Sequence, residues 1–372
     1  MRVIVSAGGT GGHIYPALAI INKLKERNKD LEVLYIGTTD RMEKDLIPSL
    51  GIPYKGIEMK GLNRKKLFKN IDVIKTYRKA VKEIKYIMKE FKPDVVLGIG
   101  GYITLPVIVA AHKLKIKTFI HEQNSIPGLS NKLLKKKVDV IGVSLEESLK
   151  YFKGSNVYFT GNPRSEEAYL AKELDKKKYG LSNNKKLVLF VMGSLGSYTV
   201  TEVVKDMIPK FKNKDYEVLF VTGKRFFENY EGVKVPDNVK MVPLLDDMLN
   251  VLKKTDLIVT RAGASTIAEI TAVGVPAIII PSPHVTHNHQ EKNAKVLEDN
   301  KSAVVILEKN LTKELLGNTI DSLIKDDKKL KEMSENSKRL GVIDSATKIA
   351  ELIEGLVNGD KNARNSKMDR KK

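Results

Sequence analysis

The chain of 372 residues contains no cysteine and no tryptophan. Without cysteine, a disulfide framework, a thiolate metal site and a cysteine nucleophile are all excluded, which is compatible with a reducing cytosol. No apolar run approaches the roughly 20 residues that a bilayer-spanning helix needs. The first residues run directly into a predicted strand and lack the apolar core and cleavage site of a signal peptide. We therefore expect a chain that neither leaves the cell nor crosses a membrane.

Acidic residues are comparatively few, since 65 Lys and Arg face 45 Asp and Glu and the formal net charge is +20. This excess favours an anionic partner such as nucleic acid, a phosphorylated ligand or an acidic lipid surface, although a lysine-rich solvated surface explains it as well. Nucleic-acid binders interleave aromatic side chains with their basic patches. The aromatic residues of this chain do not group in that way, so we expect no nucleic-acid partner.

Residues 3–16, VIVSAGGTGGHIYP, form the most informative stretch. A run of β-branched residues breaks into glycines and then opens a helix, in whose first turn Pro16 fits because it lacks an N–H. The free N–H groups and positive dipole end of such a helix favour a pyrophosphate or a developing anion, and His13 could move a proton there. The alternative is a tight packing turn with His13 as a cap. No Gly-Lys-Ser/Thr closes the loop, and it is not a clean dinucleotide fingerprint.

The succession of strand, glycine turn and helix recurs along the chain. Strands are predicted at residues 32–36, 94–98, 118–120, 138–143 and 158–160, and, after a break at 161–164, at 187–192, 217–222, 239–242, 257–260 and 277–280. With about 150 residues per domain as a guide, this pattern predicts two α/β domains with parallel, doubly wound, Rossmann-like sheets. A dehydrogenase, in which Asp40 could bind a ribose, is disfavoured because the second half carries its own glycine loop.

Two more polar or glycine-rich loops follow strands of the first half. The sequence GIGGY occupies residues 98–102, and HEQN occupies residues 121–124. Because ligands bind at the carboxyl ends of parallel strands, these loops are expected to flank the same crevice as the first glycine loop. For the second loop, a hydrogen-bonded corner that serves folding is the alternative.

The second half offers a matching constellation in residues 256–269, DLIVTRAGASTIAE. A predicted strand ends in small residues that let a ligand approach, Ser265 is the expected N-cap, and Glu269 lies one turn into the helix. An ionised carboxylate only accepts hydrogen bonds, so Glu269 could hold both hydroxyls of a ribose. Three histidines follow between residues 284 and 289, but they lack the spacing and carboxylate partners typical of a zinc site.

A basic stretch lies between residues 60 and 90. Apolar residues at helical spacing predict a helix whose core face carries Ile71, Ile74, Tyr77, Val81, Ile84 and Met88. Ahead of it, apolar and cationic side chains are interleaved without a matching acidic set, which suits the surface of an anionic bilayer. This membrane patch consists of Leu62, Arg64, Lys65, Lys66, Leu67, Phe68 and Lys69. An ordinary solvated helix and loop is the alternative.

Taken in order, these motifs resemble the MurG family of N-acetylglucosaminyltransferases, which convert lipid I to lipid II in bacterial peptidoglycan synthesis. The resemblance is carried by Gly8 to His13, Gly100 to Tyr102, His121 to Asn124, Arg261 to Ala264 with Glu269, and Gln290 with Asn293. It implies a GT-B fold, in which two Rossmann-like doubly wound domains face an interdomain cleft. Residues 1–162 would bind the acceptor and the membrane, 163–340 would bind UDP-GlcNAc, a helix at 341–357 would return to the first domain, and 358–372 would form a basic, disordered tail.

Carried over position by position, the resemblance implies two sets of site residues. The donor would contact Thr10, Gly11, Gly12, Asn124, Arg164, Ser194, Leu245, Ala264, Glu269 and Gln290, with Glu269 at the ribose, Ser194 at the diphosphate, Leu245 at the uracil and Gln290 at the transferred sugar. The acceptor would contact Gly8, Gly9, Gly100, Gly101, Tyr102, His121, Glu122 and Gln123. The donor loop at residues 192–196 reads MGSLG where the family usually has GGSQG.

The resemblance implies an inverting transfer with His13 as the catalytic base and with neither metal nor cofactor. No DxD cluster follows a predicted strand, so helix N-termini and backbone N–H groups are expected to meet the charge on departing UDP. The expected partners are UDP-GlcNAc, undecaprenyl-linked lipid I and an anionic membrane, with the protein peripheral on its cytoplasmic side. Two other interpretations stay open: a related GT-B enzyme, such as a diacylglycerol glycosyltransferase or a sugar-nucleotide epimerase, and a basic scaffold for nucleic acid or membrane.

Overall fold

The structure, a computed structural model, describes residues 1–59, 61, 70–192, 197–285 and 288–359. The chain divides into two compact units. Unit 1 consists of Met1–Arg164 together with the segment that begins at Asp344, and unit 2 consists of Ser165–Ile343. Within the described ranges, no helix combines the length and the apolar character that crossing a bilayer would require.

The described part of unit 1 contains a parallel sheet whose strands follow the order β3-β2-β1-β4-β5-β6-β7. In this sheet Val5 of the interior strand β1 pairs with Tyr35 of β2 on one side and with Leu97 of β4 on the other. The strands are β1 (Arg2–Ala7), β2 (Glu32–Thr38), β3 (Tyr54–Ile57), β4 (Val95–Gly100), β5 (Lys117–Glu122), β6 (Val140–Val143) and β7 (Val157–Phe159). β1, β2, β4, β5 and β6 are buried at nearly every position, as is typical of parallel strands with both faces covered.

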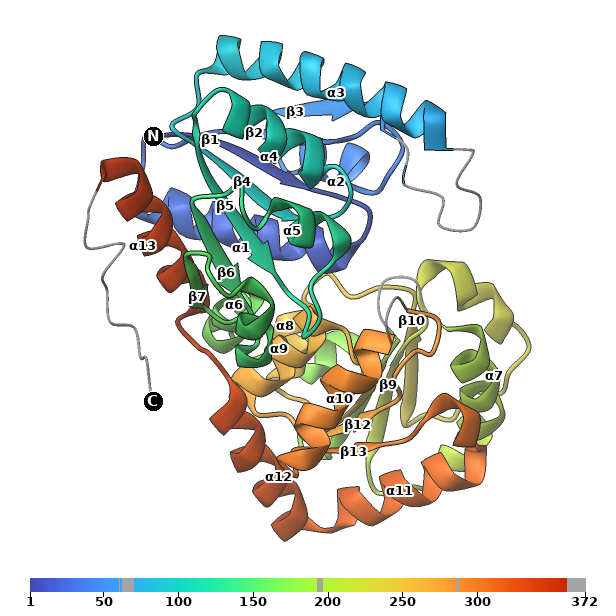
Figure 1. Cartoon of the computed structure of the whole chain (residues 1–372). Coiled ribbons are helices and arrows are strands. Elements are labelled where there is room, and N and C mark those ends of the chain that lie inside the picture. Colours follow the sequence, from blue (N-terminus) through green and yellow to red (C-terminus); the bar gives the residue numbers. More distant parts are fainter. Residues whose placement is uncertain (60, 62–69, 193–196, 286–287, 360–372) are drawn as a thin grey trace. The chain divides into compact units, whose positions relative to one another are not determined.

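Helices cover both faces of this sheet (Figure 1). One face packs against α1 (Gly11–Arg27), α2 (Glu43–Ser49) and α13 (Ser345–Asn358). The other packs against α3 (Asn70–Phe91), α4 (Thr104–Lys113), α5 (Leu129–Leu134) and the 3₁₀ helix η2 (Glu146–Phe152). The alternation of strand side chains produces these two cores, since Val3 and Val5 belong to the first and Ile4 to the second.

Unit 2 repeats this architecture with the strand order β10-β9-β8-β11-β12-β13, all pairs parallel. Its strands are β8 (Leu187–Val191), β9 (Glu217–Val221), β10 (Val239–Val242), β11 (Leu257–Thr260), β12 (Ala277–Ile279) and β13 (Ala303–Val305). Val188 and Phe190 face a core shared with α7 (Tyr198–Met207), α11 (Lys313–Lys325) and α12 (Asp327–Leu340). Leu187 and Leu189 face the opposite core. The predicted fold class, two doubly wound parallel α/β domains, is therefore confirmed.

The opposite core of unit 2 is closed by α8 (Met248–Leu252), α9 (Ala264–Val273) and α10 (His289–Asp299). The remaining helical elements are α6 (Arg164–Leu170) and the 3₁₀ helices η3 (Lys176–Tyr179), η4 (Ile208–Phe211), η5 (Lys224–Tyr230) and η7 (Glu308–Asn310).

Three local predictions were wrong. Helix α1 begins at Gly11, so Pro16 lies in its second turn and not in its first, because packing of the buried Ile14 and Pro16 extends the helix into the glycines. Helix α9 begins one residue after Gly263, which is the N-cap, and Ser265 lies inside the helix. Ile74, expected on the core face of α3, is 51% exposed, whereas its neighbour Val73 is buried.

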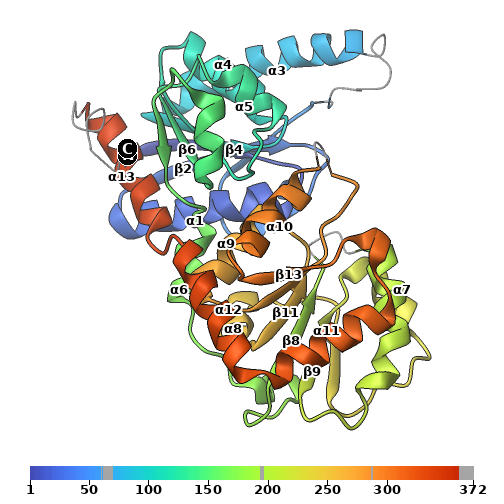
Figure 2. The ribbon, with the colours of Figure 1, turned by 60° about the horizontal axis from the view of Figure 1, so that its bottom comes forward.

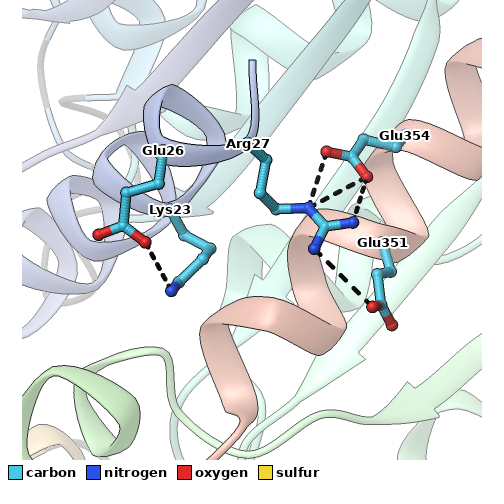
Figure 3. A network of polar contacts seen from close by, with 5 residues as sticks. All are labelled: Lys23, Glu26, Arg27, Glu351 and Glu354. Atoms are coloured by element: carbon cyan, nitrogen blue, oxygen red, sulfur yellow. Dashed lines mark hydrogen bonds and ion pairs between the residues drawn. The ribbon is translucent and has the colours of Figure 1, made fainter. Parts of the chain in front are cut away.

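The returning helix α13 lies beside α1 in unit 1, as Figure 2 shows. Ile349 and Ile353 are fully buried in the core that α1 shares with the sheet. At the surface, Arg27 at the end of α1 donates hydrogen bonds of 2.9, 3.2 and 2.8 Å to the carboxylate of Glu354, and the Glu351 carboxylate lies 3.9 Å from the Arg27 guanidinium (Figure 3). This contact joins the last helix of unit 1 to its first.

Candidate functional site

The β1 and β4 glycine loops of unit 1 pack directly against each other. The N–H of Gly8 donates to the carbonyl of Gly100 over 3.2 Å. Gly100 and Gly101 have φ angles of +129° and +86°, and a Cβ atom at Gly101 would lie 2.5 Å from the Gly8 carbonyl oxygen. Only glycine permits both the backbone conformation and the close approach. The prediction that these two loops share one edge of the sheet is confirmed by these contacts.

His13, in the first turn of α1, contacts both of these glycine loops. Its Nδ1 lies 3.1 Å from the carbonyl oxygen of Gly8, and since a carbonyl only accepts, Nδ1 carries the proton in this bond. The ring edge fits against Gly100, where a Cβ atom would lie 2.4 Å from Cδ2 of His13. In this tautomer Nε2 is the ring atom that can take up a proton. The geometry therefore suits a base that is oriented by the backbone.

Glu43, at the start of α2, binds the backbone of the first glycine loop through its carboxylate. The sequence did not reveal this role. Its side chain is fully buried and accepts hydrogen bonds from the N–H of Gly9 over 3.1 Å and from the N–H and hydroxyl of Thr38 over 3.1 and 2.7 Å. These bonds satisfy the charge of a carboxylate in the interior. The N–H of Gly9 is thereby turned toward Glu43, which fixes the loop that leads into α1.

The N-terminus of α1 is the part of this loop that is chemically suited to an anion. Thr10, the N-cap residue, is exposed and its side chain makes no capping hydrogen bond. The first amides of a helix, here those of Gly11 and Gly12, have no acceptor within the helix and carry its positive dipole end. The predicted contacts of Thr10, Gly11 and Gly12 with a phosphate or an oxyanion thus have suitable donors.

The polar end of β5 is a network of internal hydrogen bonds. The Glu122 carboxylate accepts from the N–H groups of Asn124 and Gly128, each over 2.9 Å, and from the Asn131 amide over 2.8 Å. The Gln123 amide donates to the Ile99 carbonyl over 2.6 Å. These bonds fix the course of residues 121–131, so the glutamate and glutamine shape the loop that presents Asn124.

His121 belongs to the same network and is fully buried. Its Nε2 lies 3.0 Å from the carbonyl oxygen of Gly161, to which it donates, and Nδ1 faces the Gln123 amide at 3.2 Å. Burial lowers the pKa of this histidine to about 4, because desolvation disfavours the charged imidazolium. His121 is therefore neutral near pH 7 and joins the ends of β5 and β7.

A pocket of about 470 Å³ opens from this site within unit 1. Its polar end is formed by His13, Gly100, Gly101 and the segment 122–124. Most of its remaining lining comes from α3, α4 and α5 and is apolar, so we call it the α3–α5 pocket; this lining includes Val73, Ile74, Tyr77, Leu105, Leu129 and Leu133, and Met59 and Tyr102 from the loops after β3 and β4 add to it. Tyr102 is half-buried and packs against the core on this face of the sheet. A pocket of this size accommodates a small molecule or part of a larger one.

In unit 2, polar groups gather at the N-terminus of α9. Thr260, at the end of β11, is 1% exposed, and its hydroxyl has no partner among the described residues; the buried hydroxyl of Ser265 has none either. Buried polar groups normally have a partner, so unpaired hydroxyls beside a helix N-terminus point to a ligand that would supply one. Ala264 is half-buried at the first position of the helix, and Glu269 is 9% exposed in the second turn.

Arg261 and Asn293 fix the loop that leads into α9. Arg261 donates to the Ile280 carbonyl over 3.0 Å and to the Ser197 hydroxyl that caps α7, and it forms an ion pair of 2.6 Å with Glu308. Both charged side chains are about nine-tenths buried, with exposed fractions of 9%. Asn293 of α10 donates to the Ala262 carbonyl over 3.2 Å. Contacts from the start of α7, the end of β12, η7 and α10 thus fix this loop.

The other predicted donor residues have the following surroundings. Gln290 accepts from the N–H of Ser282 over 2.8 Å through Oε1, which orients its amide. Leu245 is half-buried against the core of α8, α9 and α10. Arg164 belongs to unit 1, where its guanidinium lies 5.5 Å from the centre of the Tyr15 ring.

Ser194 and the whole membrane patch lie outside the described residues. Within the described ranges, no three His, Asp or Glu side chains are grouped as a metal site would require.

Comparison with known proteins places both units in one family. Residues 3–143 match the model of the glycosyltransferase family 28 N-terminal domain, and residues 187–353 match that of the family 28 C-terminal domain. Two curated relatives are named UDP-N-acetylglucosamine--N-acetylmuramyl-(pentapeptide) pyrophosphoryl-undecaprenol N-acetylglucosamine transferase. The protein from Bacillus licheniformis is 45% identical and that from Bacillus subtilis 44% identical, each over 96% of this chain and 99% of the relative.

A solved structure agrees with these relatives. The crystal structure of Acinetobacter baumannii MurG superimposes with a TM-score of 0.75 at 26% identity, over 95% of this chain and 99% of that one. At this coverage the match extends over both units. The chain belongs to the MurG family of N-acetylglucosaminyltransferases, within glycosyltransferase family 28.

Proposed function

We propose that this protein transfers N-acetylglucosamine from UDP-GlcNAc to undecaprenyl-pyrophosphoryl-MurNAc-pentapeptide, which converts lipid I to lipid II in peptidoglycan synthesis. The observation that carries the proposal is the near-full-length identity of 44 to 45% with enzymes named for this reaction. The chemistry of the two candidate sites supports it independently, because each unit offers a helix N-terminus at the carboxyl edge of a parallel sheet.

Unit 2 would bind the donor. The first amides of α9 and the hydroxyls of Thr260 and Ser265, which have no partner in the part of the chain that the structure describes, are suited to the diphosphate, whose charge the helix dipole favours. Glu269 would accept hydrogen bonds from the ribose hydroxyls, and Gln290 would bind the transferred sugar. Leu245 would cover the uracil, while Ala264, Ser194, Arg164 and Asn124 would complete the donor contacts.

Unit 1 would bind the acceptor at the junction of its glycine loops. The amides of Gly8 and Gly9 are engaged by Gly100 and Glu43, so these glycines would act by shaping the surface. Gly100, Gly101 and Tyr102 would form the wall next to His13. The internal bonds of His121, Glu122 and Gln123 support a positioning role for these three side chains.

In the proposed reaction, Nε2 of His13 takes the proton from the acceptor hydroxyl as its oxygen attacks the anomeric carbon. The bond between that carbon and the UDP oxygen breaks on the opposite side, so the configuration inverts and UDP leaves with the electron pair. The Gly8 carbonyl keeps the imidazole in the tautomer that accepts at Nε2. Helix N-termini stabilise the charge on the diphosphate, as preorganised dipoles do in other enzymes, and the proposal requires neither metal nor cofactor.

The protein would work at the cytoplasmic face of the cell membrane as a peripheral protein. The net charge of +20 and the basic, apolar character of residues 62–69 support attraction to anionic lipids. No nucleic-acid partner is proposed.

Isothermal titration of the full-length protein with UDP-GlcNAc tests the donor assignment. Binding is expected, and an excess of UDP should compete with it. If neither UDP-GlcNAc nor UDP binds, the proposed function falls, together with every related sugar-nucleotide function.

A further inference from the structure

The α3–α5 pocket has a polar end that the proposed reaction uses and an apolar part that it does not. Large apolar side chains are exposed along the rim of the apolar part: Ile74 to 51%, Leu129 to 45% and Leu133 to 51%. Apolar side chains that gather around a hollow, instead of being scattered singly, indicate a binding surface. Met59, Val73 and Leu105 extend the apolar lining into the pocket.

The charge around this rim favours an anionic occupant. Ile74 is followed by the exposed Lys75, and Leu133 is preceded by the exposed Lys132. The polar part of the lining holds His13, the two φ-positive glycines 100 and 101, and Glu122, whose carboxylate is already engaged by the N–H groups of Asn124 and Gly128. A ligand that fits both parts has an apolar chain joined to an anionic, hydrogen-bonding head.

We propose that the α3–α5 pocket binds the isoprene units next to the diphosphate of a polyprenyl diphosphate, so that the first part of the lipid chain rests in the protein. This inference rests on the proposed function, since the acceptor of that reaction carries a polyprenyl chain on a pyrophosphate. The diphosphate then lies at the polar end beside the glycine loops, and the bound isoprene units fix the distance of the sugar from His13. The rest of the chain leaves over the rim formed by Ile74, Leu129 and Leu133.

The pocket accordingly distinguishes acceptors by the apolar group on the diphosphate. The first isoprene units add affinity because they are removed from water, whereas units beyond the pocket add little. Farnesyl diphosphate, with three isoprene units, and inorganic pyrophosphate, with none, are suitable probes below the concentration at which micelles form. We expect the full-length protein to bind farnesyl diphosphate at least about 10-fold more tightly than pyrophosphate, given the apolar area that one isoprene unit buries.

Neutral polar substitutions at the rim test whether the apolar rim causes this preference, because they leave the net charge of the protein unchanged. Leu129→Gln and Leu133→Gln alter exposed positions, so folding is not at stake, and Leu50→Gln is the matched control because Leu50 of unit 1 is 51% exposed and does not line the pocket. In isothermal titration, each rim variant is expected to lose most of the preference for farnesyl diphosphate over pyrophosphate. The control is expected to keep it.

Transfer assays on the same proteins separate this inference from the proposed function. The rim variants should raise KM for a polyprenyl acceptor several-fold and leave KM for an acceptor with a short alkyl group unchanged. If the wild type transfers N-acetylglucosamine but binds farnesyl diphosphate no better than pyrophosphate, or if the rim variants keep the preference, the inference is overturned and the function stands. If prenyl binding depends on the rim but no transfer occurs, the function falls instead.

A bilayer contact at the rim is the competing explanation and gives a different result. In that case the rim variants would lose binding to anionic vesicles and keep their affinity for farnesyl diphosphate in solution. That result would contradict the proposal that the α3–α5 pocket binds isoprene units.

Discussion

At the scale of single residues, the account depends most on His13. Its Nδ1 bond to the Gly8 carbonyl leaves Nε2 as the proton acceptor, and its place at the acceptor loops separates it from the residues assigned to uridine. We predict that His13→Ala lowers kcat by about 10²- to 10⁴-fold, as is usual on removal of a general base, with little change in donor affinity. Steady-state kinetics and titration with UDP-GlcNAc measure the two effects.

His112→Ala is the control for this variant, because His112 is an exposed histidine on α4 of the same unit. The pH profile adds a second criterion. The wild type is expected to show a limb near neutrality that is missing in His13→Ala, and a limb shared by both proteins would assign the base to another residue.

Glu269 is the residue on which the donor assignment depends. If its carboxylate accepts from the ribose hydroxyls, Glu269→Ala removes charged hydrogen bonds and should weaken UDP-GlcNAc binding by about 10- to 100-fold, the equivalent of roughly 1.5–3 kcal/mol. Glu314→Ala, at an exposed position of α11 in the same unit, should leave binding unchanged. Equal affinities of both variants would remove Glu269 from the site, provided that circular dichroism shows both to be folded.

At the scale of elements, the end of β5 predicts a dependence of stability on pH. The pKa of His121 is lowered to about 4 in the folded state, whereas an unfolded histidine titrates near 6.5. The unfolded chain therefore binds the extra proton first, and the free energy of unfolding falls as the pH drops from about 6.5 toward 4, by about 2 kcal/mol between pH 7 and pH 5.

Urea unfolding of wild type and His121→Gln at the two pH values measures this contribution. The variant cannot take up the proton, so its loss of stability between pH 7 and pH 5 should be smaller by about that amount, while exposed His112→Gln should behave as wild type. Equal pH dependence in all three proteins would show that the buried imidazole is not the source.

The same elements show what the sequence can and cannot predict. The strand at residues 257–260 was predicted with its observed bounds, β11 being Leu257–Thr260, because the run LIVT is rich in β-branched residues, which favour strands. The start of α1 was misplaced because glycine has low helix propensity, which tertiary packing overrides here. Helical spacing placed Ile74 in the core, but spacing alone does not reveal that a pocket opens beside it.

The candidate site was predictable where its residues are contiguous and not where they are distant. The glycine loops and His13 stand out in the sequence, and their common edge follows from the parallel sheet. Glu43 does not stand out, since its partner Gly9 lies 34 positions away and nothing local marks its burial. Likewise, the sequence could not show that the polar side chains of residues 121–123 are satisfied by Gly161, Ile99 and Asn131.

At the scale of the whole molecule, the charge of the chain predicts how it meets a membrane. Each cation near an anionic surface contributes about 1 kcal/mol, so reversing Lys65, Lys66 and Lys69 to glutamate should lower the affinity for anionic vesicles by at least about 100-fold at low salt. The matched control reverses Lys325, Lys328 and Lys331, which are exposed in unit 2. If co-sedimentation falls equally for both triple variants, only net charge matters, and if neither changes, another surface binds the membrane.

The central claim concerns the whole reaction, and acceptor-dependent transfer tests it most directly. Purified full-length protein is incubated with UDP-GlcNAc labelled in the sugar and with lipid I, and the released UDP and the lipid-linked disaccharide are both measured. The account predicts one UDP for each disaccharide, a β-linked product from the α-linked donor, and no consumption of UDP-GlcNAc without acceptor. Consumption without acceptor, transfer to diacylglycerol in place of lipid I, or an α-linked product would contradict it.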